Sequence, residues 1–176
     1  ERLLDQYRQH PLRILGALNA IAPWLRPEQT AAVLTHISRH GHHDHDEACA
    51  ELLSALYAQL AATERNTLVD TLTTVCSARV ACQTLQRLAP EFDPATAAIA
   101  FDAAMRIAAS ATERRQTSVS LLVSLDDEHQ IAVLRMLART SRERELAEWL
   151  SQAVPDLRPA ARSCAIEMAQ HFETAS

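Results

Sequence analysis

A dense cluster of histidine and aspartate side chains is the first feature of this sequence that could do chemistry. The cluster reads SRHGHHDHDEA and comes directly after His36 and Ile37. Imidazole and carboxylate groups are ligands that zinc and related ions accept. His36 and His40 are one helical turn apart, so both imidazoles would lie on one helix face, and His42, His43 or His45 could add a third ligand. The sequence thus offers His36, His40 and His42 as weak candidates for a metal site, and as a pH-responsive group between about pH 5 and 7.

The same cluster also has a plainer interpretation, as a junction between two helices. A helix that begins at Pro27 would end near His40, and Gly41 would be its C-cap. Asp44 would be the N-cap of the next helix, with Glu47 completing a capping box. The cluster also fits the pattern H-x-H-x-D-H of metallo-β-lactamase-type hydrolases, but that pattern needs a loop after a β-strand. We therefore expect a polar helix junction here and no cofactor.

Cys76 is the second candidate for chemistry. The stretch VCSARVACQTL, from Val75 to Leu85, resembles the catalytic segment of the novel E3 ubiquitin ligase family of secreted bacterial effectors. That family carries Cys-x-Asp-Arg on an all-helical domain; Cys76 and Arg79 match it, whereas Ala78 stands where the family has its aspartate. The resemblance implies that Cys76 is a catalytic nucleophile that accepts ubiquitin as a thioester. A thiolate needs activation, so the alternative is a small buried residue near a helix end.

Three closely spaced arginines are the third candidate. Arg139, Arg142 and Arg144 lie in the segment ARTSRERELAEWL, next to Trp149. Arginine and tryptophan are enriched at the energetic centres of protein interfaces, which suggests contact with an acidic partner. The alternative is a solvated helix start, with glutamates of the same segment as ion-pair partners. Trp149 and Trp24 both occur at apolar helical positions, and we expect both in the core.

Composition indicates the kind of elements that must position these residues. The 176 residues contain only two glycines, whereas sheet-rich enzymes need glycine for tight turns and phosphate loops. The abundance of alanine, leucine, arginine, glutamine and glutamate favours helices. No cysteine pair has C-x-x-C spacing, so the four cysteines are expected to be free thiols. The sequence therefore predicts an all-α protein.

Apolar residues recur at a spacing that predicts a repeated helical hairpin of about 33 residues. Each copy has a helix-start signal, and a second amphipathic segment precedes it. The layout resembles the HEAT, armadillo and tetratricopeptide α-solenoids, in which neighbouring hairpins stack because one hairpin cannot bury its own apolar face. We predict a single domain over 1–176 with about ten helices in stacked antiparallel hairpins, as a short α-solenoid or a compact helical bundle. The anchor residues of the five copies are Leu34, Leu72, Phe101, Leu134 and Ile166.

The absence of lysine bears on function. All 17 basic residues apart from histidine are arginine. A GC-rich genome is one explanation, and selection against ubiquitin acceptors is the other. The second explanation favours a bacterial effector that is secreted into the cytoplasm of a host cell. The first residues lack the features of a signal peptide, and the start without methionine suggests a domain of a longer protein.

Net charge and the length of apolar runs bear on which classes of partner to expect. The net charge of −5, without a basic stripe, makes nucleic acid an unexpected partner. No apolar run is long enough to span a membrane. We therefore expect a domain that binds another protein, either a host target or a ubiquitin-conjugating enzyme. An effector E3 ubiquitin ligase is the alternative, and a metal- or pH-responsive helical module is a further one, so the sequence leaves enzymatic activity open.

Overall fold

The computed structural model describes residues 7, 10–41, 43–140, 150 and 154–174, and this part of the chain is helical, with no β-strand. The predicted all-α class and the predicted helical hairpins are confirmed. None of the described helices is long and apolar enough to cross a membrane. The nine α-helices with assigned bounds are α2 (Pro11–Ile21), α3 (Pro27–His40), α4 (Asp46–Tyr57), α5 (Ala62–Val75), α6 (Ala78–Leu88), α7 (Pro94–Ile107), α8 (Ala111–Leu121), α9 (Asp127–Thr140) and α11 (Pro159–Thr174).

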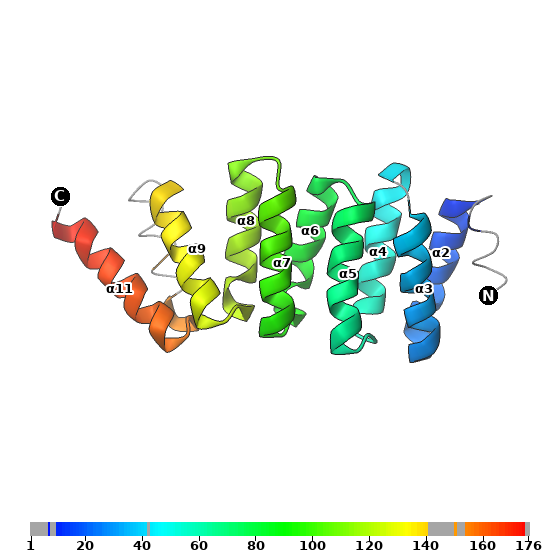
Figure 1. The fold of residues 1–176 in the computed structure, drawn as a ribbon, viewed down its shortest axis with the longest axis horizontal. Helices are drawn as coiled ribbons and strands as arrows, with labels where there is room; N and C mark the ends of the chain where they lie inside the picture. The colour runs from blue at the N-terminus through cyan, green and yellow to red at the C-terminus, as the bar shows by residue number, and fades with distance from the viewer. Residues whose placement is uncertain (1–6, 8–9, 42, 141–149, 151–153, 175–176) are drawn as a thin grey trace.

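The helices form two layers in an elongated row, with the termini at opposite ends (Figure 1). In layer A, α4 packs between α2 and α6, and α6 packs against α8. In layer B, α5 packs between α3 and α7, and α9 packs against α11. Each layer A helix is followed in the chain by a layer B helix, so the repeating unit is an antiparallel hairpin. The colours of Figure 1 show that α3, α5, α7 and α9 run in the same direction.

The repeat is more regular than the sequence anchors suggested. The layer B helices begin at residues 27, 62, 94, 127 and 159, so successive starts are 35, 32, 33 and 32 residues apart. The layer A helices α2, α4, α6 and α8 begin 35, 32 and 33 residues apart. In this register the equivalent of Leu34 in the second hairpin is Val69. The anchor Leu72 was wrong by one helical turn, because Leu72 is itself buried and has the same periodicity.

One turn geometry is repeated in every hairpin. After the layer A helix, a backbone amide donates to the carbonyl oxygen three residues earlier, and the N···O distance is 3.2 or 3.3 Å in all five turns. Four of the turns are 3₁₀ turns: η1 (Ala22–Trp24), η3 (Ala89–Glu91), η4 (Leu122–Ser124) and η5 (Val154–Asp156). The layer B helix starts two residues after the donor, often at a proline whose missing amide costs nothing there. The donors are Leu25, Leu60, Phe92, Leu125 and Leu157.

Side chains join each turn to the next. Gln59 donates to the carbonyl oxygen of Ala22 and accepts from Thr30, and the Tyr57 hydroxyl donates to Glu91 O at 3.3 Å. Ser124 donates to Ala89 O at 2.7 Å. Gln130, which is fully buried, donates to Leu122 O at 2.8 Å and accepts from the Arg158 amide at 3.0 Å. Because buried carbonyl and amide groups need partners, these bonds fix the register between neighbouring hairpins.

The core is a continuous cluster of leucine, alanine, valine and isoleucine between the layers. The seventh residue of each layer B helix is 4% exposed or less in all five copies: Val33, Leu68, Ala100, Val133 and Ala165. Burying one leucine-sized side chain stabilises a protein by about 1.5–3 kcal/mol, so these repeated positions contribute to the stability of the stack in every hairpin. The apolar residues that the sequence pattern placed inside are therefore largely where it predicted.

Two sequence-based expectations about single residues are wrong. Trp24 is 78% exposed at the hairpin turn η1 and is not in the core. Asp44 is not the N-cap of α4, because a 3₁₀ turn, η2 (His43–His45), precedes the helix and His45 is the N-cap, without a side-chain bond. Gly41 is the C-cap of α3, as expected, but its φ of −64° is not left-handed. Trp149 lies outside the described residues.

Candidate interaction surface

Cys76 occupies a buried structural position at the C-terminal end of α5. Its side chain is 2% exposed, and the thiol donates to the carbonyl oxygen of Asp46 at 3.4 Å. Burial, with smaller contributions from the nearby Cys49 and Asp46, raises the pKa of the Cys76 thiol from 9.0 to about 12. The thiol is therefore protonated at neutral pH. A protonated, covered thiol is a poor nucleophile.

The repeat explains why a small residue stands at this position. Cys76 is the C-cap of α5, as Gly41 is of α3 and Ala108 is of α7. All three residues have extended backbone angles with ψ between 120° and 154°, where the chain leaves layer B for layer A. The neighbouring Arg79 is exposed and lies 4.0 Å from Glu47, in a weak surface ion pair. These features favour the structural interpretation of Cys76 over the nucleophilic one.

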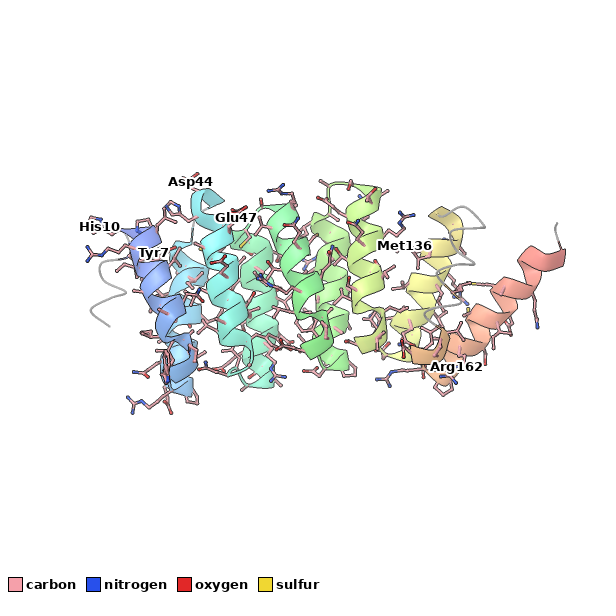
Figure 2. All side chains as sticks on the ribbon, turned by 180° about the vertical axis from the view of Figure 1, so that it is seen from behind. Tyr7, His10, Asp44, Glu47, Met136 and Arg162 are labelled. Carbon is pink, nitrogen blue, oxygen red and sulfur yellow. The ribbon has the colours of Figure 1, made fainter. Side chains whose placement is uncertain are left out.

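The histidine cluster forms a packed junction at the start of the row. The rings of His36 and His40 are 4.8 Å apart between centroids, and the buried Tyr7 ring meets His36 edge-on at 5.2 Å. Asp46 accepts hydrogen bonds from the amide and the hydroxyl of Ser77, which ties α4 to the start of α6. Figure 2 shows Asp44 and Glu47 at the edge of the stack where α4 begins. His42 lies outside the described residues.

A metal site would need three such ligands within reach of one ion. Within the described ranges, no group of three or more histidine, cysteine, aspartate or glutamate side chains has that arrangement. His36 is half-buried, and its ring packs against those of Tyr7 and His40. The described part of this segment joins α3 to α4, and the candidate ligand His42 lies outside it.

The outer side of layer B is the candidate interaction surface. In α3, α5, α7 and α9, the sixth, ninth and thirteenth residues of each helix point away from layer A, and eleven of these twelve side chains are exposed. Ile99, the exception, is half-buried. We call this set the outer B face. Its sixth residues are Ala32, Thr67, Ile99 and Ala132; its ninth are Thr35, Asp70, Asp102 and Arg135; its thirteenth are Arg39, Thr74, Arg106 and Arg139.

Four arginines of the outer B face have no ion pair or hydrogen bond from their side chains to any described residue: Arg39, Arg106, Arg135 and Arg139. Outside this face, Arg65, Arg87 and Arg162 each bond a neighbouring turn or helix, whereas the side chains of Arg13 and Arg158 also have no partner among the described residues. α3, α5 and α7 pack side by side and run in the same direction, so their thirteenth residues lie along one edge of the layer. α9 packs mainly against α11 and continues the row at a distance from α7. Arginine at the thirteenth position also complements the negative end of each helix.

The arginine segment predicted from the sequence meets this face at one point. Arg139 is exposed in the last turn of α9 and belongs to the outer B face. Arg142 and Arg144 lie outside the described residues. Sequence reasoning missed Arg39, Arg106 and Arg135, because they are far apart in the chain and come together only through the repeat. Their place in the register, counted from each helix start, is the signal that would have found them.

Comparison with protein-family models, with curated proteins and with solved structures finds no match to this chain.

Proposed function

We propose that this chain is a protein-binding domain that uses the outer B face. The observation that carries the proposal is the row of arginines on this face that have no partner among the described residues. Residues at the core positions of the repeat pack between the layers, and residues at the turn positions form hydrogen bonds between hairpins. The residues of the outer B face do neither. Unpaired guanidinium groups on a rigid face are suited to bidentate contact with carboxylates.

The charge pattern suggests the chemistry of the partner. Arg106, Arg135 and Arg139 lie on α7 and α9, and Asp70 and Asp102 lie on α5 and α7. A partner with carboxylates opposite α9 and a basic group opposite α5 would fit this pattern in one register only. Complementary charges of this kind fix orientation and accelerate association.

The absence of lysine suggests where the domain acts. A lysine-free chain offers no side-chain acceptor for ubiquitin, which is an advantage in the cytoplasm of a eukaryotic host. We therefore propose that the domain belongs to a bacterial effector that is delivered into host cells.

Two double variants with the same change in net charge test the binding proposal. Arg106→Glu with Arg139→Glu reverses two charges on the outer B face, and Arg13→Glu with Arg79→Glu reverses two exposed charges of layer A. Proteins captured from a host-cell extract are quantified for the wild type and both variants at low and high salt. We expect a partner that the layer A variant retains, that the outer B face variant loses, and that salt weakens. Equal capture by both variants would exclude the outer B face as the binding site.

Ubiquitin ligation is the second candidate function, and the lysine-free composition favours it as well. A domain that docks a charged conjugating enzyme needs no nucleophile of its own, so the burial of Cys76 does not oppose that route. The test measures discharge of conjugating-enzyme-bound ubiquitin to free lysine, with wild type and Cys76→Ala. Alanine occupies the equivalent position in α7, so this variant is expected to fold. Stimulation by both proteins supports docking, stimulation lost in Cys76→Ala supports a thioester, and no stimulation excludes a ligase.

A further inference from the structure

The layer B helices α7 and α9 diverge from one another. The Phe101 ring in the middle of α7 meets the His129 ring in the first turn of α9 edge-on, with the ring centroids 6.1 Å apart. The two helices do not pack along their length, whereas α5 packs along both α3 and α7. Figure 1 shows α9 inclined away from α7, so the C-terminal ends of the two helices lie further apart than their N-terminal ends. Toward its C-terminal end, α7 therefore lacks the close following neighbour that α3 and α5 have among the described helices of layer B.

The size of one repeated side chain agrees with this divergence. The tenth residue of a layer B helix lies two turns after the third, and in α9 the third residue, His129, faces α7. The tenth residue is Thr71 in α5 and Ala103 in α7, and these small residues are 2% and 0% exposed where the helices pack closely. In α9 it is Met136, which is half-buried. Because the distance between packed helices depends on the side chains at the contact, the larger Met136 favours a wider separation of α9 from α7.

Met105 and Met136 occupy the facing sides of α7 and α9. Met105 follows Phe101 by one helical turn, and Met136 follows His129 by two turns, so each methionine is on the side that carries the ring contact. Both side chains are half-buried and pack against the core. Figure 2 shows Met136 on the side of α9 that faces the middle of the row. Methionine is flexible and is common on surfaces that adapt to a bound apolar group. We call Met105 and Met136 the methionine pair.

Arginines flank the methionine pair on the outer B face. Arg106 follows Met105 directly, and Arg139 follows Met136 by one turn. Both arginines are exposed in the last turn of their helices, where α7 and α9 are furthest apart, and neither side chain has a partner among the described residues. Asp102 is exposed one turn before Arg106. The site therefore combines apolar side chains with positive charge where the helices are far apart and negative charge where they are closer.

We propose that an amphipathic helix of the partner binds between α7 and α9, with apolar side chains on the methionine pair and carboxylates on Arg106 and Arg139. The proposal rests on the proposed function of the outer B face and adds the chemistry of the partner. Carboxylates match the two arginines, and Asp102 disfavours acidic residues deeper in the site. A bound segment also needs partners for its backbone amides and carbonyl groups. Because the backbones of α7 and α9 are engaged within their own helices, the segment must satisfy these groups itself, as a helix does.

Methyl NMR tests this arrangement, because the chain contains three methionines and the third, Met168 on α11, is an internal control that is also half-buried. The probe is a synthetic helical peptide with leucines along one face and glutamates at one end, and the control peptide has arginine in place of each glutamate. Titration of the probe into protein with isotopically labelled methionine methyl groups should shift the Met105 and Met136 resonances and leave that of Met168 unchanged. The control peptide should bind at least about tenfold more weakly, and high salt should weaken binding of the probe.

A double alanine variant separates this proposal from the proposed function. Met105→Ala with Met136→Ala shortens both side chains, and alanine already occupies the equivalent positions, as Ala138 in α9 and Ala103 in α7, so this variant is expected to fold. It should weaken binding of the probe peptide at least about tenfold, because it removes apolar area from the contact. Leu12→Ala, at an exposed leucine of α2, should leave binding unchanged. Circular dichroism verifies the helicity of both variants.

The pattern of losses distinguishes insertion between the helices from contact with the arginines alone. Binding that Arg106→Glu with Arg139→Glu weakens, and that the double alanine variant does not, would keep the outer B face as the site and overturn insertion between α7 and α9. No binding of the probe peptide, or a shift of the Met168 resonance alone, would also overturn the insertion. Shifts of the Met105 and Met136 resonances with protein concentration, in the absence of peptide, would overturn it in favour of a second copy of this chain.

Discussion

At the scale of single residues, the two glycines have opposite roles. A Cβ at Gly41 would clash with the Val75 side chain and would lie 2.7 Å from the carbonyl oxygen of Ile37, whereas a Cβ at Gly16 would meet nothing within 4 Å. Gly41 is therefore required by the close approach of α5 to the end of α3. Gly16 is an exposed helical glycine that leaves the unfolded chain needlessly flexible.

Substituting each glycine by alanine tests this difference. Gly41→Ala should lower the free energy of unfolding by about 1–3 kcal/mol, as for other overpacked sites. Gly16→Ala should raise it by about 0.5–1 kcal/mol, because alanine is the better helix former. Urea denaturation monitored by circular dichroism measures both changes. Val75→Ala in the Gly41→Ala background should recover part of the loss; no recovery would show that the clash with Val75 is not the cause.

The raised pKa of Cys76 predicts how stability depends on pH. The thiol holds its proton up to about pH 12 in the folded state and loses it above pH 9.0 in the unfolded state. Its contribution to stability is therefore complete below pH 9 and declines as the pH rises toward 12, by up to about 1.4 kcal/mol per pH unit. Tyr7 and Cys49, whose pKa values burial also raises, act in the same direction. Urea denaturation between pH 8 and about pH 11 should show a smaller decline for Cys76→Ala than for wild type; identical slopes would contradict the burial of this thiol.

At the scale of elements, the sequence predicted helices and hairpins well and their register less well. The anchors Leu34, Phe101, Leu134 and Ile166 each fall at the eighth residue of their helix, because the same apolar spacing repeats in α3, α7, α9 and α11. The anchor Leu72 falls one turn later in α5, because this threonine-rich helix has apolar residues in two overlapping patterns. The 3₁₀ turn before α4 had no sequence signal at all.

The hydrogen bonds between turns could not be predicted from the sequence. A variant of Gln130 tests their importance. Gln130→Leu keeps the volume of the side chain but leaves the carbonyl oxygen of Leu122 and the amide of Arg158 without this partner. The Leu122 carbonyl keeps its bond from the Leu125 amide, so the main loss is at the Arg158 amide, and a buried polar group left unsatisfied costs about 1–3 kcal/mol. Hydrogen exchange should therefore accelerate in α11 and the turn before it, more than in α4 and α5. The exposed Gln116→Leu is the control, and equal protection of α11 in both variants would contradict the role of Gln130.

At the scale of the whole molecule, the repeat separates the positions that stabilise the fold from the surface proposed to bind a partner. The positions between the layers are apolar in every hairpin, and the turns use one backbone geometry five times. The outer B face differs from helix to helix: its ninth residue is threonine on α3, aspartate on α5 and α7, and arginine on α9. A sequence pattern identifies the repeated positions, because burial between the layers requires an apolar residue at the same place in every hairpin. It does not rank surface residues, whose value depends on a partner that the chain does not contain.

Site-specific photo-crosslinking tests the central claim, that the outer B face contacts the partner. A photoreactive amino acid replaces Thr67 or Ala132, the exposed sixth residues of α5 and α9, or Gln83 or Gln116, the exposed sixth residues of α6 and α8. The four sites match in helix position and exposure and differ only in layer. After irradiation in a host-cell extract, the account predicts covalent adducts with one protein at Thr67 and Ala132 and background levels at Gln83 and Gln116. Adducts confined to the layer A sites, or equal at all four, would contradict it.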